Sequence, residues 1–174
     1  GKNIRKAFLR SPLEFSRITS GFSQARFHPI HQTWRTHKGI DYAAPVGTRV
    51  KATGDGIIDF AGKQGGYGNL VVIRHQGRFT THYGHLNGFA PGIRKGVRVS
   101  QGDVIGYVGN TGWSTGPHLH YEFRINNVHQ NPLSVALPSA PPLAPQQLAE
   151  FKRRTEPLVS RIEQTRGMRL ALLE

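Results

Sequence analysis

The sequence predicts an all-β domain followed by a C-terminal helical tail. Glycine accounts for 21 of the 174 residues, well above the usual share of about 7%. These glycines separate short runs of β-branched and aromatic residues, a pattern typical of strands joined by tight turns. Signals for helices are nearly absent between residues 37 and 131.

Six strand candidates follow one another through this region. They are TRVKAT (48–53), GIIDFAG (56–62), NLVVIRH (69–75), RFTTHYGHL (78–86), DVIGYVG (103–109) and LHYEFRI (119–125). The third and fourth are expected to form a hairpin, with Gln76 and Gly77 at its turn.

The composition changes near the C-terminus. Residues 137–146, LPSAPPLAPQ, hold four prolines and predict a stiff, extended linker. We therefore divide the chain into four parts: an N-terminal extension (1–19), a main domain (20–132), a Pro-rich linker (133–146) and a helical tail (147–174).

The tail carries one apolar helical stripe, made of Leu148, Phe151, Leu158 and Ile162. Pro145 suits the start of such a helix, whereas Pro157 is expected to kink or break it. We expect this stripe to pack on the domain or on a missing neighbour rather than to take part in chemistry.

The chain is strongly basic. Lys and Arg number 23 against 10 Asp and Glu, which gives a formal net charge of +13. Unless the charge is simply a solvated surface, it favours an anionic partner such as nucleic acid, anionic lipid or an acidic cell-wall polymer.

The chain contains no cysteine, which excludes disulfides and thiolate metal sites and fits an exported bacterial protein. No run is long and apolar enough for a transmembrane helix, and no signal-peptide pattern is present. Because the sequence begins with Gly1 rather than Met, we expect any targeting segment to lie upstream.

Two histidines lie two residues apart in GPHLHYEFR (116–124). Because strand side chains alternate, His118 and His120 are expected on a polar, open face together with Glu122 and Arg124. The alternate residues should point into the core: Leu119, Tyr121, Phe123 and Ile125. Imidazoles on such a face suit metal binding or proton transfer, although most surface histidines do neither.

A second group occurs in THKGIDYAAP (36–45), where His37 and Asp41 are four apart. Gly39 argues against a helix, but a turn with a short strand could bring both side chains to one point. With His120 they would form two imidazoles and one carboxylate, a ligand set for a catalytic zinc that leaves a fourth position for water. The alternative is that Asp41 caps a turn and His37 is exposed.

A third group is THYGHLN (81–87). Strict alternation puts four residues on one face, namely Phe79, Thr81, Tyr83 and His85, with His82 opposite. His85 is therefore a candidate for the active side, and His82 is interpreted as a structural or surface histidine.

Several of these segments resemble one family. HKGIDYAAPVGTRVKATGDGII, GYGN, THYGHL, KGVRVSQGDVIGYVGNTG and STGPHLHYEF resemble the lysostaphin-type (LytM-like) zinc peptidoglycan endopeptidases in order, spacing and residue type, over roughly residues 20–132. The preceding FSQARFHPIHQTW is closest in character to the cell-wall endopeptidases of Gram-negative bacteria. Arg49 stands where proline is common in the family. Trp113 stands where Arg or other residues are common, and is expected to shape the rim of the substrate groove.

The resemblance implies an antiparallel sheet forming an open groove, with Zn²⁺ held by His37, Asp41 and His120. It implies that His85 and His118 are catalytic, one taking the proton of the zinc-bound water and the other stabilising the oxyanion; we favour His118 as the base. Glu122 would either orient a ligand imidazole or be a plain surface residue.

The implied substrate is a peptide crosslink of peptidoglycan. We expect cleavage between D-alanine and diaminopimelate, with pentaglycine cleavage as a less favoured alternative. The implied location is the periplasm or cell envelope, and upstream domains or a regulatory partner are possible.

Three other classes compete with this interpretation. A nucleic-acid binder would explain the charge but would leave the His/Asp set unused. A lipoyl- or biotinyl-carrier domain is suggested by KGVRVSQGDVIGYVG, but the lysine that it needs at a hairpin tip is missing. The third is a non-catalytic LytM-like activator of other wall hydrolases, which should bind no zinc or keep its wall affinity after chelation.

Overall fold

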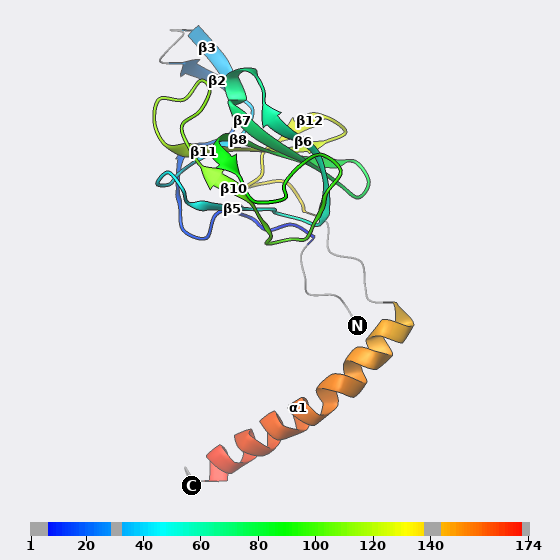
Figure 1. The fold of residues 1–174 in the computed structure, drawn as a ribbon. Coiled ribbons are helices and arrows are strands. Elements are labelled where there is room, and N and C mark those ends of the chain that lie inside the picture. Colours follow the sequence, from blue (N-terminus) through cyan, green and yellow to red (C-terminus); the bar gives the residue numbers. More distant parts are fainter. Residues whose placement is uncertain (1–6, 29–32, 138–143, 172–174) are drawn as a thin grey trace. The chain divides into compact units, whose positions relative to one another are not determined.

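A computed structural model describes residues 7–28, 33–137 and 144–171 (Figure 1). The chain divides into two compact units. One spans Ala7–Pro138, and the other contains the C-terminal helix. Each unit is described by itself.

The first unit is built from antiparallel strands. The strands are β1 (Arg17–Ser20), β2 (Ser23–His28), β3 (Thr33–His37), β4 (Ile40–Ala43), β5 (Arg49–Lys51), β6 (Gly56–Lys63), β7 (Asn69–His75), β8 (Phe79–Phe89), β9 (Arg98–Val99), β10 (Val104–Val108), β11 (His118–Ile125) and β12 (Val128–Gln130). A single 3₁₀ turn, η1 (Gly65–Tyr67), precedes β7 within the described residues. All six predicted strands are present, as β5, β6, β7, β8, β10 and β11.

Ten of these strands form one open sheet. Its main order is β1-β4-β11-β8-β7-β6-β9, with β12 paired to β11, β10 paired to β8, and β5 paired to β10. Strands β2 and β3 form a separate pair. The predicted antiparallel all-β class is therefore confirmed. The predicted hairpin joins β7 to β8, and Gly77 at its turn has the left-handed φ of 79° that favours glycine.

The core lies between the long strands and the β5–β10 pair. Leu119 and Tyr121 of β11, Ile73 of β7 and Val50 of β5 belong to one buried hydrophobic cluster. The inward face predicted for β11 is confirmed for Leu119, Tyr121 and Phe123, each of which is nearly fully buried.

The opposite face of β11 differs from the prediction. It was expected to be open, but His120 is 9% and Glu122 only 1% exposed. The reason is that β11 lies inside the sheet between β4 and β8, and Tyr67 of the η1 turn reaches over its polar face to Glu122. Both faces of β11 are therefore buried, one in the hydrophobic core and the other among polar and charged side chains.

Residues before β1 also belong to this unit. Phe8 and Leu13 are buried, and Phe8 packs edge-on against Phe123, with ring centroids 5.0 Å apart. The backbone N–H of Leu9 donates to the carbonyl of Thr53, 2.7 Å away. This segment therefore contributes side chains to the core of the unit.

The tail forms the helix α1 (Pro145–Ala171), which begins at the proline that the sequence indicates (Figure 1). The predicted break at Pro157 is wrong, because the helix continues through it. Near this point Glu150 pairs with Arg154 one turn later, and the hydroxyl of Thr155 donates to the carbonyl of Phe151. Contacts between residues four apart stabilise the helix on either side of the proline, whose missing N–H costs only one backbone hydrogen bond.

The apolar stripe of α1 is largely exposed within the second unit: Phe151 by 56%, Leu158 by 58% and Ile162 by 67%. Its packing on a partner therefore stays a prediction. No helix in the described part of the chain is long and apolar enough to cross a membrane.

Candidate metal centre

Three predicted ligands come together from three strands. His37 ends β3, Asp41 lies in β4, and His120 lies in β11 directly opposite Asp41 in the antiparallel register. Gly39 joins β3 to β4 where the backbone passes close to β11. A Cβ at this position would lie 2.6 Å from the carbonyl oxygen of Tyr121 and 2.7 Å from the His120 ring. Only glycine fits this turn without moving His120.

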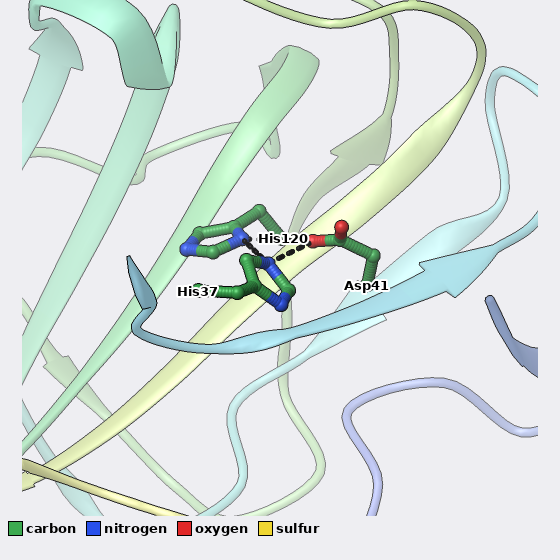
Figure 2. A group of neighbouring side chains, drawn as sticks. All are labelled: His37, Asp41 and His120. Atoms are coloured by element: carbon green, nitrogen blue, oxygen red, sulfur yellow. Dashed lines mark hydrogen bonds and ion pairs between the residues drawn. The ribbon is translucent and has the colours of Figure 1, made fainter. Parts of the chain in front are cut away.

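The three donor atoms form a compact triangle (Figure 2). His37 Nε2 lies 3.1 Å from Asp41 Oδ1, His120 Nδ1 lies 2.8 Å from the same oxygen, and the two nitrogens are 3.3 Å apart. A tetrahedral zinc with bonds of about 2.0–2.1 Å separates neighbouring donors by roughly 3.3 Å. The size and chemistry of the triangle therefore fit such an ion.

Each of these imidazoles is anchored through its other nitrogen. His37 Nδ1 lies 2.7 Å from the carbonyl oxygen of Gly21, which can only accept a hydrogen bond. His120 Nε2 lies 3.1 Å from Glu122 Oε1. A metal-binding imidazole is neutral, and with its proton on the outer nitrogen each ring would offer its inner nitrogen, His37 Nε2 or His120 Nδ1, to an ion in the triangle.

The close contacts between these side chains shift the pKa values of Asp41 and His120. Burial alone would raise the pKa of Asp41, but hydrogen bonds from His120 and His37 outweigh it and hold the pKa well below its usual value. Burial alone would lower the pKa of His120, whereas its contacts with Asp41 and Glu122 raise it to about 9. In the metal-free protein, the carboxylates thus stabilise positive charge where a cation would bind.

His85 reaches the site through a β-bulge. Tyr83 pairs with Val71 and Leu86 with Asn69, so three steps along β8 match two along β7. His85 lies in this irregular stretch and has a left-handed φ of 60°. A bulge of this kind re-aims a side chain and is frequent beside active sites.

The predicted alternation of β8 is therefore wrong at His85. Thr81 and Tyr83 point into the core, where their hydroxyls lie 2.9 Å apart. His85 instead joins the polar side, where its ring centroid is 5.8 Å from that of His120. His82 lies on this side too, since it pairs with Glu122 across the sheet.

His85 is held as a neutral ring. Its Nδ1–H donates to the carbonyl of Thr111, 2.7 Å away, which leaves the lone pair of Nε2 available. Burial lowers the pKa of His85 to about 4, although the hydrogen bond to Thr111 acts in the other direction.

The ring of His118 is also oriented by a backbone carbonyl. Its Nδ1–H donates to the carbonyl of Gly116 at 2.7 Å, and the hydroxyl of Ser114 lies 3.1 Å from the same nitrogen. Its Nε2 lies 3.8 Å from Asp41 Oδ1, and its ring centroid is 4.7 Å from that of His85. All five predicted site residues therefore meet at one place.

His82 is buried beside this site but is not part of the triangle. Burial lowers its pKa to about 4, with the charge of Arg124 acting in the same direction. Its Nδ1 has no hydrogen-bond partner among the described residues. This surrounding is in keeping with the structural role predicted for it.

The loop that orients His85 and His118 packs closely against the η1 turn. Gly68 and Gly112 have left-handed φ values of 64° and 77°, and a Cβ on Gly112 would lie 2.4 Å from the backbone nitrogen of Gly68. Trp113 donates its backbone N–H to the carbonyl of Gly66, and its side chain is 62% exposed. The loop of residues 109–116 thus supplies both carbonyls that orient His85 and His118.

The sequence did not single out Tyr67, although GYGN was among the segments that indicated the family. Its hydroxyl donates to Glu122 Oε1 at 2.9 Å, and burial together with the charge of Glu122 raises its pKa to about 12. The surface alternative for Glu122 is wrong, because its carboxylate is buried and contacts the imidazole of His120.

The family model of Peptidase family M23 matches residues 35–132, more than half of the chain. The chain belongs to peptidase family M23. The predicted family is thus confirmed, and the matched M23 segment holds all five site residues.

The relatives of this M23 domain include named wall enzymes. The chain is 52% identical over 154 residues to the DD-carboxypeptidase/endopeptidase Mpg of Neisseria meningitidis, a match that covers 87% of this chain and 35% of that protein. It is 44% identical over 162 residues to the peptidoglycan DD-endopeptidase ShyC of Vibrio cholerae, covering 91% and 37%. The chain thus spans little more than a third of the length of these relatives.

Solved structures share the fold. A zinc-containing peptidase from Vibrio cholerae superposes with a TM-score of 0.71 at 38% identity, covering 77% of this chain and 41% of that one. The catalytic domain of lysostaphin from Staphylococcus simulans superposes with a TM-score of 0.60 at 30% identity, covering 68% and 90%.

Proposed function

We propose that this M23 domain is a zinc metallopeptidase that hydrolyses peptide crosslinks of peptidoglycan, as a D,D-endopeptidase acting between D-alanine and diaminopimelate. The observation that carries the proposal is the donor triangle of His37, Asp41 and His120, with His85 and His118 beside it. The names of the relatives in Neisseria and Vibrio support the reaction and the substrate class.

In this proposal His37, Asp41 and His120 hold the zinc. A bound zinc would lower the pKa of its water and polarise the carbonyl of the bond to be cut. The protein leaves room for this chemistry, because the triangle supplies three ligands and a tetrahedral ion takes four.

In the proposal, His118 and His85 transfer a proton and stabilise negative charge next to the fourth coordination position. Each ring leaves its Nε2 for the reaction, because each Nδ1–H is bound to a backbone carbonyl. We assign the general base to His118, whose Nε2 lies 3.8 Å from the ligand oxygen of Asp41. His85 would stabilise the negative charge that develops on the carbonyl oxygen once its Nε2 carries a proton that it can donate.

The charge of the chain suits this substrate. Stem peptides of the wall carry carboxylates, and a net charge of +13 attracts an acidic polymer. The proposal places the protein in the periplasm or cell envelope. Upstream domains and a regulatory partner belong to the same proposal, because the chain spans only part of its relatives.

A digestion experiment tests the function against the alternative of a non-catalytic activator. Purified protein is expected to hold one equivalent of zinc and to open crosslinked muropeptides from a diaminopimelate-containing wall, as weighed by mass spectrometry. A chelator should stop this reaction. Zinc-free protein that still binds wall without cutting it would favour the activator, and release only from pentaglycine-linked wall would contradict the proposed substrate.

A further inference from the structure

Glu122 is a buried carboxylate next to the metal centre that the proposed chemistry does not use. It lies two residues after His120 on β11, so both side chains point to the same face, and it is only 1% exposed. A buried charge is tolerated only when it is paired and hydrogen-bonded. Its partners therefore indicate what holds it there.

The two oxygens of Glu122 have different partners. Oε1 accepts from His120 Nε2 at 3.1 Å and from the hydroxyl of Tyr67 at 2.9 Å. Oε2 accepts from Arg124 Nε at 2.9 Å and also from Nη2 of the same guanidinium. An ionised carboxylate has about four acceptor positions, so this one is fully engaged.

This arrangement determines which nitrogen of His120 is free. A carboxylate oxygen only accepts, so His120 must carry its proton on Nε2 to bond to Glu122. Without a metal, Nδ1 can also hold a proton and donate it to Asp41 Oδ1, 2.8 Å away. A metal ligand must be a neutral imidazole, and in that form the proton on Nε2 leaves the lone pair on Nδ1.

We propose that Glu122 is a positioning residue that holds His120 in the Nε2–H form and aims its Nδ1 at the metal. The inference rests on the proposed zinc peptidase. Arg124 and Tyr67 act through Glu122 by keeping the carboxylate in place. Because Arg124 binds Oε2 through both Nε and Nη2, the carboxylate cannot rotate toward the metal and replace a ligand.

The first test measures zinc affinity by competition with a chromophoric chelator. In Glu122→Gln the charge is lost and the new amide group meets donors from Arg124 and His120, so zinc should bind about 10–100-fold more weakly. Glu14→Gln is the matched control, since Glu14 is an exposed carboxylate paired with Lys51. Glu122→Asp, which keeps the charge, should recover part of the affinity.

The second test needs no variant. In the wild-type protein loaded with cadmium-113, coupling to the ring protons and nitrogens of His120 should identify Nδ1 as the bound atom. Zinc-loaded wild type should also show a slowly exchanging Nε2–H resonance from His120, and this resonance should move or vanish in Glu122→Gln.

The outcomes separate this inference from the function it rests on. Wild type that binds no zinc overturns both. If the wild type binds zinc but Glu122→Gln keeps the same zinc affinity and the same His120 resonance, only the role of Glu122 is overturned. Coupling through Nε2 of His120 overturns it as well, even if every variant at Glu122 fails to fold.

Discussion

The Nδ1–H of His85 donates to the carbonyl oxygen of Thr111, and the ring of His85 lies 4.7 Å from that of His118, which bonds to the carbonyl of Gly116. One loop thus orients both histidines, and both present the same ring nitrogen. The proposed metal ligands His37 and His120 are anchored elsewhere, on the Gly21 carbonyl and on Glu122. Proton transfer and metal binding should therefore respond to different substitutions.

We expect His118→Ala and His85→Ala to reduce turnover of crosslinked muropeptides while leaving bound zinc largely unchanged. Removal of a general base or of a charge-stabilising group typically lowers the rate about 10²–10⁴-fold. The measurement is kcat together with zinc content by atomic absorption. Loss of zinc in either variant would show that the histidine is a ligand.

Substitution within the donor triangle should instead remove the bound zinc. Asp41→Ala and His120→Ala each remove one of the three ligands. Loss of a residue that only contacts a ligand typically weakens metal binding about 10–100-fold, and we expect a larger loss of zinc affinity here. Activity should be lost with the metal, and excess zinc should restore it only in part. Full activity of His120→Ala without added zinc would refute the assignment.

Gly112→Ala should disturb catalysis without touching a reacting group. A methyl at this left-handed position would lie 2.4 Å from the backbone nitrogen of Gly68, so the loop that carries Thr111 must shift. A displacement of about 1 Å at the reacting groups can lower the rate about 100-fold. Gly116→Ala is the control in the same loop, because its methyl would meet nothing within 4 Å. Equal kinetics of the two variants would contradict the expectation.

We expect the free energy of unfolding of the domain to fall in weak acid because His75 becomes protonated. This ring donates to the carbonyl of Asp55 and contacts Thr81, and burial lowers its pKa in the folded protein. The unfolded chain takes up this proton near pH 6.5, so the contribution of His75 is present above about pH 6.5 and is lost as the pH falls toward the lower folded pKa.

Urea unfolding at about pH 7.5 and about pH 5 measures this contribution. Wild type should lose more free energy of unfolding between the two than His75→Gln, by about 1.4 kcal/mol for each unit of pKa depression. Glutamine keeps polar contacts but cannot take up the proton. An equal loss in both proteins would exclude His75 as the source.

Much of the metal centre could be predicted from local pattern. Strand alternation correctly separated Leu119 and Tyr121 from His118 and His120, because β11 is regular. Asp41 meets His120 through cross-strand register, which one sequence does not reveal, and only the resemblance to a family linked the two segments. The burial of Glu122 was missed for a related reason, since Tyr67 covers it from a distant turn.

His85 was assigned to the site by an alternation that it does not obey. The bulge in β8 has no clear mark in the sequence apart from Gly84, because its left-handed φ falls on a histidine. Pro157 was mispredicted for a different reason. Proline strongly disfavours the interior of a helix, yet here the helix continues through it.

The pairing of β1 with β4 has a practical consequence for anyone who trims this protein. A shortened version that starts where the family match starts, at residue 35, would lack β1 and leave β4 as a bare edge of the sheet. It would also lack the Gly21 carbonyl that steadies His37. Such a fragment should aggregate and bind zinc poorly, so recombinant boundaries belong before Phe8.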